Sequence, residues 1–385
     1  MSTLKVDTIT KADGTGSLSV PAESGTVVTT ASPSLGRRNL IINGAMQVAQ
    51  RGTQVTGETG SGYKTCDRWQ AAISSLGTWT IDQSTDAPSG FSNSFKLTCT
   101  TADASPAAGD AMYLRYSIEA QDCQHLAYGS SSANTTTLSF WVKSNKTGTY
   151  KVAPYVSDSG RLLGGTYTIN SADTWEQKTI TIIGDTGGSI ANDNGDGLVL
   201  HFFLGAGSNF TSGTSQSAWT AYSAGDFGAG QTVNLADATS NYFEITGVQL
   251  EVGSVATPFE HRSYGEELAL CQRYLHRMSY SSGADGTLGL AAGYNSTSVN
   301  IVVNHPVSLR TSPSVSVSGT NWLYLAYGAA SQLSSATPAL GDGSTFNPST
   351  TRLYQGSLTG INTGGCYWCL VTSSGSGWIN FDAEI

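Results

Sequence analysis

The sequence predicts an all-β protein: an antiparallel sandwich, one short helix and a smaller C-terminal β domain. Three observations predict this fold class. Charged residues make up only 12% of the 385 residues and glycine occurs 45 times, which is typical of β-rich chains with many turns. Short segments alternate between apolar and polar residues, the period of strands with one buried face. Apolar residues follow a convincing helical spacing in a single stretch.

The overall composition excludes several classes of protein. Eight tryptophans and 17 tyrosines are more than disordered chains usually carry. A formal net charge of −9 argues against a nucleic-acid partner, because phosphate contacts need clustered Lys and Arg. No apolar run approaches the roughly 20 residues that span a bilayer, and the N-terminus has no apolar signal core. We therefore expect no nucleic-acid binding, no membrane insertion and no export by a standard signal.

Residues 1–36 consist of short extended pieces between Gly and Pro turns. Leu4 and Val6 alternate with Lys5 and Asp7, as in a strand. The segment is too small for a core of its own, so we expect it to pair with copies of itself or with another protein. A disordered tail is the alternative.

Residues 37–262 supply strands whose inward residues can be followed by their alternation. Between Ile245 and Val248 the inward positions change from odd to even numbers, which indicates a β-bulge at Gly247. Many one-sided strands joined by polar turns predict an antiparallel sandwich. The clearest inward sets are Phe95, Leu97 and Cys99; Leu114, Tyr116 and Ile118; Leu138, Phe140 and Val142; and Leu198, Leu200, Phe202 and Leu204.

One helix is predicted over residues 263–278. Ser263 and Glu266 fit a capping box at its start. This helix is expected to link two domains, and its apolar stripe packs either on a neighbouring domain or on sister helices of an oligomer. The stripe, at steps of four, three, four and three, is Tyr264, Leu268, Cys271, Leu275 and Met278.

Residues 279–385 return to the alternation of strands, as at Val299, Ile301 and Val303. The stretch 331–348 is rich in Ser, Gly, Thr and Pro and is interpreted as an exposed loop. We interpret residues 279–385 as a separate C-terminal β domain.

The chain carries no standard catalytic motif. It has no Gly-x-Ser-x-Gly elbow, no phosphate-binding loop and no His-Glu-x-x-His sequence, and its five histidines are scattered singly. We therefore expect no catalytic residue and no enzymatic activity. Six irregularly spaced cysteines are expected to be mostly free, buried thiols. Cys366 and Cys369 should point to opposite faces of a strand, which does not suit a shared metal.

One loop has the composition of a calcium site. Residues 192–197, NDNGDG, place oxygen donors two and three residues apart beside glycines. Asp193, Asn194 and Asp196 are the expected ligands if the loop binds a structural calcium ion. Such clusters also form ordinary turns, so both interpretations stay open. We expect no other cofactor.

Outward-facing aromatic residues are the candidate binding residues. Sugars have flat CH faces that stack on indole and phenol rings. Trp141 lies opposite the apolar set of its strand, and Trp322 and Tyr324 lie opposite theirs in the C-terminal domain. Each is predicted either to stack on a carbohydrate or receptor, or to pack against another subunit or layer.

Two phrases bracket the central sandwich and resemble a known family. The first is NLIINGAMQVAQR at residues 39–51 with CDRW at residues 66–69; the second is FEITGVQLEVG at residues 243–253 with PFEHR at residues 258–262. Together with the internal TLSFWVK and WEQKTI segments, they resemble tail fibre proteins of tailed bacteriophages that carry a carbohydrate-binding-module-like jelly roll. The resemblance covers roughly residues 1–278 and transfers no sugar-binding residue.

The resemblance implies a virion structural protein, commonly a homotrimer. Residues 1–36 would attach it to other phage tail or virion proteins, and residues 279–385 would contact a host-surface glycan or other receptor. Such a protein is assembled in the host cytoplasm and located in the virion. The alternatives are a collar, head fibre or decoration protein without a receptor, and a glycan depolymerase.

Overall fold

The protein is described from a computed structural model that defines residues 9–10, 17–18, 37–279, 286–318, 323–327, 330–334, 338–340, 347–371 and 377–385. The chain divides into two compact units, residues 1–38 and residues 39–385. In the first unit, β1 (Ile9–Thr10) pairs antiparallel with β2 (Ser17–Leu18). The rest of the predicted attachment segment 1–36 lies outside the described residues.

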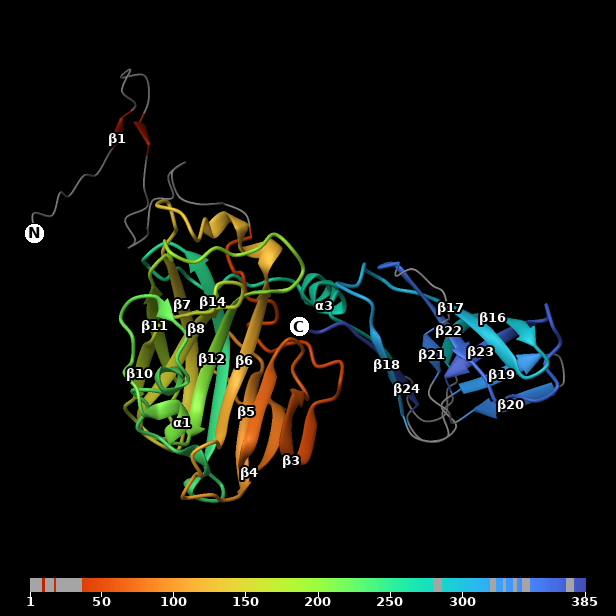
Figure 1. The fold of residues 1–385 in the computed structure, drawn as a ribbon, viewed down its shortest axis with the longest axis horizontal. Helices are drawn as coiled ribbons and strands as arrows, with labels where there is room; N and C mark the ends of the chain where they lie inside the picture. Colours follow the sequence, from red (N-terminus) through yellow and green to blue (C-terminus); the bar gives the residue numbers. More distant parts are fainter. Residues whose placement is uncertain are drawn as a thin grey trace, which may run out of the picture. The chain divides into compact units, whose positions relative to one another are not determined.

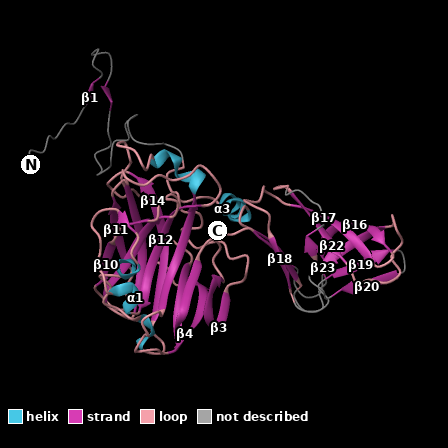
Figure 2. Ribbon diagram, viewed as in Figure 1, coloured by secondary structure: helices cyan, strands magenta, loops and turns pink. Residues whose placement is uncertain are grey.

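The second unit begins with an antiparallel sandwich, which confirms the predicted all-β class (Figure 1). Its pairing order is β11-β7-β14-β5-β4-β6-β12-β8-β9-β13, with β10 on β8 and β3 on β4. The strands form two layers, as in a jelly roll, and Figure 2 shows how strands dominate this unit. The strands are β3 (Gln54–Tyr63), β4 (Gln70–Ser84), β5 (Ser94–Thr101), β6 (Ala111–Glu119), β7 (Thr136–Ser144), β8 (Gly148–Val156), β9 (Arg161–Leu162), β10 (Gly165–Ile169), β11 (Glu176–Ile182), β12 (Asp196–Ala206), β13 (Thr220–Ala221) and β14 (Tyr242–Val252).

The long strand β4 belongs to both layers. Its first half pairs with β6 and its second half with β5. Between the halves, Ser75 and Gly77 have positive φ values of 53° and 72°, which turn the strand. The first layer is therefore β11-β7-β14-β5-β4, and the second is β4-β6-β12-β8 with β10 at its edge.

The core between the layers is aromatic and fully buried. Trp69 lies 4.8 Å from Tyr116 between ring centroids, and Phe140 lies 5.4 Å from Phe202. The four inward sets predicted from alternation are all buried. The predicted bulge is also confirmed, because Gly247 has a φ of 61° and the β14–β7 register shifts between Thr246 and Gln249.

The predicted helix is shorter than expected. α3 (Tyr264–Gln272) has the capping box between Ser263 and Glu266. It ends before Leu275 and Met278, which lie on β15 (Leu275–Ser279) paired with β24 (Trp378–Asp382). The continuation of the stripe beyond residue 272 was therefore wrong: the pairing of residues 275–279 with residues 378–382 outweighs the local helical spacing.

Several short helical elements were not predicted. They are η1 (Ala120–Leu126), α1 (Ser208–Thr211), α2 (Ala224–Phe227) and η2 (Leu235–Asp237). None is long enough to show a helical period in the sequence. No helix in the described part of the chain is long and apolar enough to cross a membrane.

Residues after α3 form two further antiparallel sheets. One is three-stranded, β15-β24-β18, and the other is seven-stranded, β20-β19-β23-β16-β17-β22-β21. Val299, Ile301 and Val303 are buried in their shared core, as predicted. The remaining strands are β16 (Gly286–Asn295), β17 (Ser298–Asn304), β18 (Ser314–Val317), β19 (Leu323–Tyr327), β20 (Ala330–Ser334), β21 (Ala339–Leu340), β22 (Thr350–Gln355) and β23 (Cys366–Val371).

All six cysteines are free thiols, and five of them are buried. Cys366 is exposed and Cys369 is buried on the same strand, β23. The two side chains therefore lie on opposite faces, as the sequence predicted.

Candidate functional site

An aromatic cluster lies on the outer face of the layer β4-β6-β12-β8, away from the main core. On β6, Leu114 is buried in the core, whereas Tyr113 belongs to the outer cluster. On β12, Phe203 stands opposite Tyr113, and on β8, Tyr155 stands opposite Val199. Alternation along three adjacent strands therefore gathers these rings on one face of the sheet.

The segment that contains α1 and α2 completes the cluster. Phe227, at the end of α2, lies edge-on to Phe203 with ring centroids 4.9 Å apart, and to His201 at 4.6 Å. Tyr222 follows β13 and lies 5.5 Å from Phe227 and 5.6 Å from Tyr155. Part of the cluster is thus contributed by a connecting segment rather than by the sheet itself.

Three phenol groups form the accessible part of this cluster. Tyr113 and Tyr155 are half-buried, and Tyr222 is 42% exposed. The Tyr155 and Tyr222 rings lie 5.6 Å apart between centroids. Burial and the neighbouring phenols of Tyr113 and Tyr155 raise the pKa of Tyr222. Within the described ranges none of the three hydroxyls has a hydrogen-bond partner. We call this surface, Tyr113, Tyr155 and Tyr222, the tyrosine face.

His201 lies beneath the tyrosine face and is uncharged at neutral pH. Its side chain is only 5% exposed, and its Nδ1 lies 3.1 Å from the Ala153 carbonyl oxygen. Burial, together with the nearby charge of Arg115, lowers its pKa to about 3. On β12 His201 alternates with the core residues Leu200 and Phe202, and the outer cluster buries it.

Two basic side chains border the tyrosine face, and each has a partner within the protein. Arg115 forms an ion pair with Asp196 and donates from Nη1 to the Ile385 main-chain oxygen at 3.0 Å. Lys151 is fully buried, and its Nζ donates to Ser215 Oγ at 2.8 Å. Burial lowers the pKa of Lys151 to about 8. Arg115 is paired with a carboxylate and the Lys151 ammonium is buried, so neither presents a free charge at the surface.

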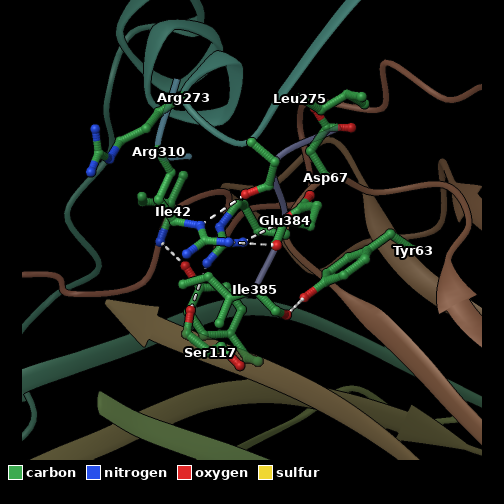
Figure 3. A network of polar contacts seen from close by, with 12 residues as sticks. Ile42, Tyr63, Asp67, Ser117, Arg273, Leu275, Arg310, Glu384 and Ile385 are labelled. Atoms are coloured by element: carbon green, nitrogen blue, oxygen red, sulfur yellow. Dashed lines mark hydrogen bonds and ion pairs between the residues drawn. The ribbon is translucent and has the colours of Figure 1, made fainter. Parts of the chain in front are cut away.

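Glu384 and Ile385 lie near Ser117 of the same layer (Figure 3). The Ile385 oxygen is the acceptor of the Arg115 hydrogen bond. The Tyr63 hydroxyl donates to the Ile385 oxygen at 2.5 Å. Glu384 forms ion pairs with Arg51, at 3.4 Å, and with Arg68. The C-terminal residues are therefore bonded to the sandwich next to Arg115, which borders the tyrosine face.

The chemistry of the tyrosine face suits a carbohydrate. The CH faces of pyranose rings stack on aromatic rings, and phenol hydroxyls both donate and accept hydrogen bonds. A site with few charges and several convergent hydroxyls orients a sugar without a metal or an acid–base pair.

Trp141, predicted either to stack on a carbohydrate or to pack against another subunit or layer, lies on the other layer of the sandwich. It stands on β7 opposite Gln177 of β11 and Thr246 of β14, and its side chain is half-buried. A Cβ atom on Gly247 would lie 3.1 Å from the Trp141 ring, so the bulge makes room for the indole. Trp141 is therefore not part of the tyrosine face.

The other two candidates, Trp322 and Tyr324, come after α3 in the chain. Trp322 lies outside the described residues, and Tyr324 is on β19 but its side chain is not described. An indole of the same seven-stranded sheet as β19, Trp368 on β23, is 58% exposed. Trp368 lies between Cys366 and Cys369 in the sequence and was not among the predicted binding residues.

The predicted calcium ligands take separate partners. Asp193 accepts from the Gly195 amide at 2.8 Å, and Asn194 donates to the Arg310 carbonyl at 2.7 Å. Asp196 is already neutralised by Arg115. Across the described ranges no group of three His, Cys, Asp or Glu residues could hold a metal ion. Calcium binding by this loop stays a prediction from the sequence.

The residues of the predicted helical stripe separate in the structure. Leu268 packs in a small apolar cluster with Ile42, Val48, Cys271 and Tyr274, so α3 lies on the opening segment of the sandwich. Tyr264 is 58% exposed. Leu275 is fully buried, and Met278 packs on the C-terminal core.

The tyrosine face was missed, although its signal was present. Tyr113 alternates with the inward set of β6, and Phe203 and His201 alternate with that of β12. Alternation does not show that β12 pairs with β6 on one side and with β8 on the other. Tyr222 lies in a connecting segment, where no alternation applies. Alternation therefore predicts which face of its strand each residue occupies, but not which residues of other strands lie beside it.

No family model and no curated protein matches the chain. Solved structures do match. One is the enzymatically active domain of tailspike protein 4 of bacteriophage CBA120, at 15% identity and a TM-score of 0.29, covering 56% of this chain. The match spans only 21% of that tailspike domain.

Two further matches are carbohydrate-related proteins. A family 4 carbohydrate-binding module is 12% identical with a TM-score of 0.27, covering 55% of this chain and 98% of that one. A sugar-binding protein described as putative, from Bacteroides thetaiotaomicron VPI-5482, is 12% identical with a TM-score of 0.31, covering 56% of this chain and all of that one. The assignment of this chain as an antiparallel jelly-roll sandwich rests on its own strand pairing.

Proposed function

We propose that this protein is a non-enzymatic, carbohydrate-binding virion component that attaches a tailed phage to glycans on its host. The observation that carries the proposal is the tyrosine face: three neighbouring phenols with hydroxyls free to bond a ligand, on the outer face of a jelly-roll sandwich. The location in a virion and the attachment to a host surface are inferred from the resemblance of residues 1–278 to phage tail fibres.

The remaining parts of the proposal follow the same resemblance. The protein would be a homotrimer assembled in the host cytoplasm, with residues 1–36 bound to other tail or virion proteins. A single site of millimolar affinity gives about 4 kcal/mol, and simultaneous engagement of several sites makes attachment tight. The C-terminal domain, with Trp322 and Tyr324, would be a second receptor contact.

Point substitutions test the proposal better than deletion of residues 279–385. That deletion would also remove Glu384 and Ile385, which contact Arg68, Tyr63 and Arg115 of the sandwich. A loss of binding would then have two explanations. Substitutions on the tyrosine face leave those contacts in place.

The test is binding of the purified protein to whole host cells. Tyr155→Ala/Tyr222→Ala is expected to reduce cell binding at least tenfold, while Tyr264→Ala, an exposed tyrosine on α3, leaves it unchanged. Equal binding by the double variant and the wild type would contradict the role of this face. No binding by the wild type to any host cell would favour a collar, head fibre or decoration protein, and release of oligosaccharides from host polysaccharide would favour a depolymerase.

A further inference from the structure

Two histidines meet where the two C-terminal sheets join. His276 lies on β15 of the three-stranded sheet, and His305 directly follows β17 of the seven-stranded sheet. Their Nδ1 atoms are 2.9 Å apart, a hydrogen bond in which one nitrogen donates and the other accepts. The side chains are 8% and 9% exposed, so water does not readily replace this bond.

The surroundings hold both rings in place. The Phe381 ring on β24 stacks on His276 with centroids 5.7 Å apart and lies edge-on to His305 at 5.0 Å. On the other side, His305 Nε2 lies 2.8 Å from the Thr351 hydroxyl on β22. The pair thus connects β15 and β24 of one sheet with β17 and β22 of the other.

The charged groups on the packed elements are directed elsewhere. Arg277 of β15 stacks on Trp378 at 4.5 Å, and Asp382 of β24 pairs with Arg51 at 2.8 Å. Arg352 of β22 is exposed. β17 and β18 carry no charged residue. Within the described part of the chain neither imidazole has an ion-pair partner, so no carboxylate offsets a positive charge on the pair.

We propose that the His276–His305 hydrogen bond is an acid-sensitive junction that holds the seven-stranded sheet on the three-stranded sheet while at least one imidazole is neutral. One added proton can be shared, because a charged ring still donates to a neutral one. A second proton makes both Nδ1 atoms donors and places two like charges side by side in a buried site. The contact then breaks, and the two sheets separate at this point.

The direction of the pH dependence follows from burial. Burial lowers the pKa of each imidazole to about 4. In the unfolded chain both titrate near their ordinary value of about 6.5. The stabilisation is therefore complete above about pH 6.5 and is lost as the pH falls towards 4.

Hydrogen exchange of β17 and β22, corrected for the intrinsic pH dependence of exchange, tests the junction. In the wild type, protection of both strands is expected to fall at least tenfold between pH 6 and pH 3.5. In His276→Asn, whose amide can replace Nδ1 but cannot become charged, the midpoint should move down by at least one pH unit. His125→Asn, at an exposed position on η1, should behave as the wild type.

Two results would overturn the proposal: unchanged protection of β17 and β22 in the wild type down to pH 3, or the same midpoint in His276→Asn. Should His276→Asn fail to fold, the titration of both imidazole rings can be followed by side-chain NMR of the wild type. The two rings are expected to titrate below pH 5 in coupled steps. Independent titration of both rings near pH 6.5 would also overturn the proposal.

Discussion

The Asn39 side chain joins the two ends of the sandwich through Leu250, 211 residues away. Asn39 Oδ1 accepts from the Leu250 amide at 3.0 Å, and the Leu40 amide donates to the Leu250 carbonyl at 2.9 Å. Asn39 Nδ2 also donates to the Val248 carbonyl at 3.1 Å. The two sequence phrases that bracket the sandwich are therefore bonded to each other.

Asn39→Ala is expected to destabilise the sandwich by about 2 kcal/mol or more. The substitution leaves the Leu250 amide and the Val248 carbonyl without partners in a buried site, at about 1–3 kcal/mol for each lost partner. Chemical denaturation gives the free energy of unfolding. Asn209→Ala, an exposed position on α1, is the control and should change stability by less than about 0.5 kcal/mol. A similar effect of both substitutions would contradict the bridging role.

Gly247→Ala is expected to destabilise the protein by about 1–3 kcal/mol. The φ of 61° is strained for a residue with a Cβ atom, and that atom would lie 2.6 Å from Phe91 Cζ. Gly265→Ala on α3 has no atom within 4 Å of the new Cβ and should be neutral or stabilising. Thermal unfolding of the two variants compares them directly; a stable Gly247→Ala would show that the bulge is not required.

Arg68→Met is expected to cost about 3–5 kcal/mol. Arg68 is 1% exposed, pairs with the buried Glu384 and stacks on Tyr274 at 3.4 Å, so its removal takes one partner from a buried carboxylate. Lys64→Met removes a more exposed pair with Glu58 and should cost less than about 1 kcal/mol. Comparable losses of unfolding free energy in the two variants would mean that the Arg68 pair adds little.

Acidification should destabilise the sandwich through His201. Because burial lowers the His201 pKa to about 3, the unfolded chain binds a proton that the folded chain does not between about pH 6.5 and pH 3. The contribution is complete above pH 6.5 and falls by up to about 1.4 kcal/mol per pH unit below it. His201→Asn should lose less stability between pH 7 and pH 4 than His125→Asn. Identical losses would show that His201 is not the group that titrates.

The sandwich was predictable because alternation fixes which side of a strand faces the core. The sets around Leu114, Phe140 and Phe202 are buried as expected, and the change of phase at Gly247 marks a real bulge. The end of α3 was not predictable, because Leu275 satisfies a helical stripe and a strand equally well. Its pairing with Asp382, more than 100 residues away, decides between them.

The candidate site depends on contacts that local patterns do not contain. Tyr113, Tyr155 and Tyr222 come together only after β6, β12 and β8 are paired and the α1–α2 segment folds over them. The prediction of Trp141 used the same reasoning about outward aromatics but selected the other layer. The outward direction of a side chain alone therefore does not show which outward aromatic residues gather into one cluster.

The most direct test of the account is a calorimetric titration of the protein with soluble oligosaccharides prepared from the host surface. The wild type should bind one of them with a Kd of about 1 mM or tighter, and Tyr222→Ala should weaken it about tenfold, or about 1.4 kcal/mol. Tyr264→Ala should bind as the wild type does. Equal affinities of the wild type and Tyr222→Ala would contradict the tyrosine face as the site of glycan binding.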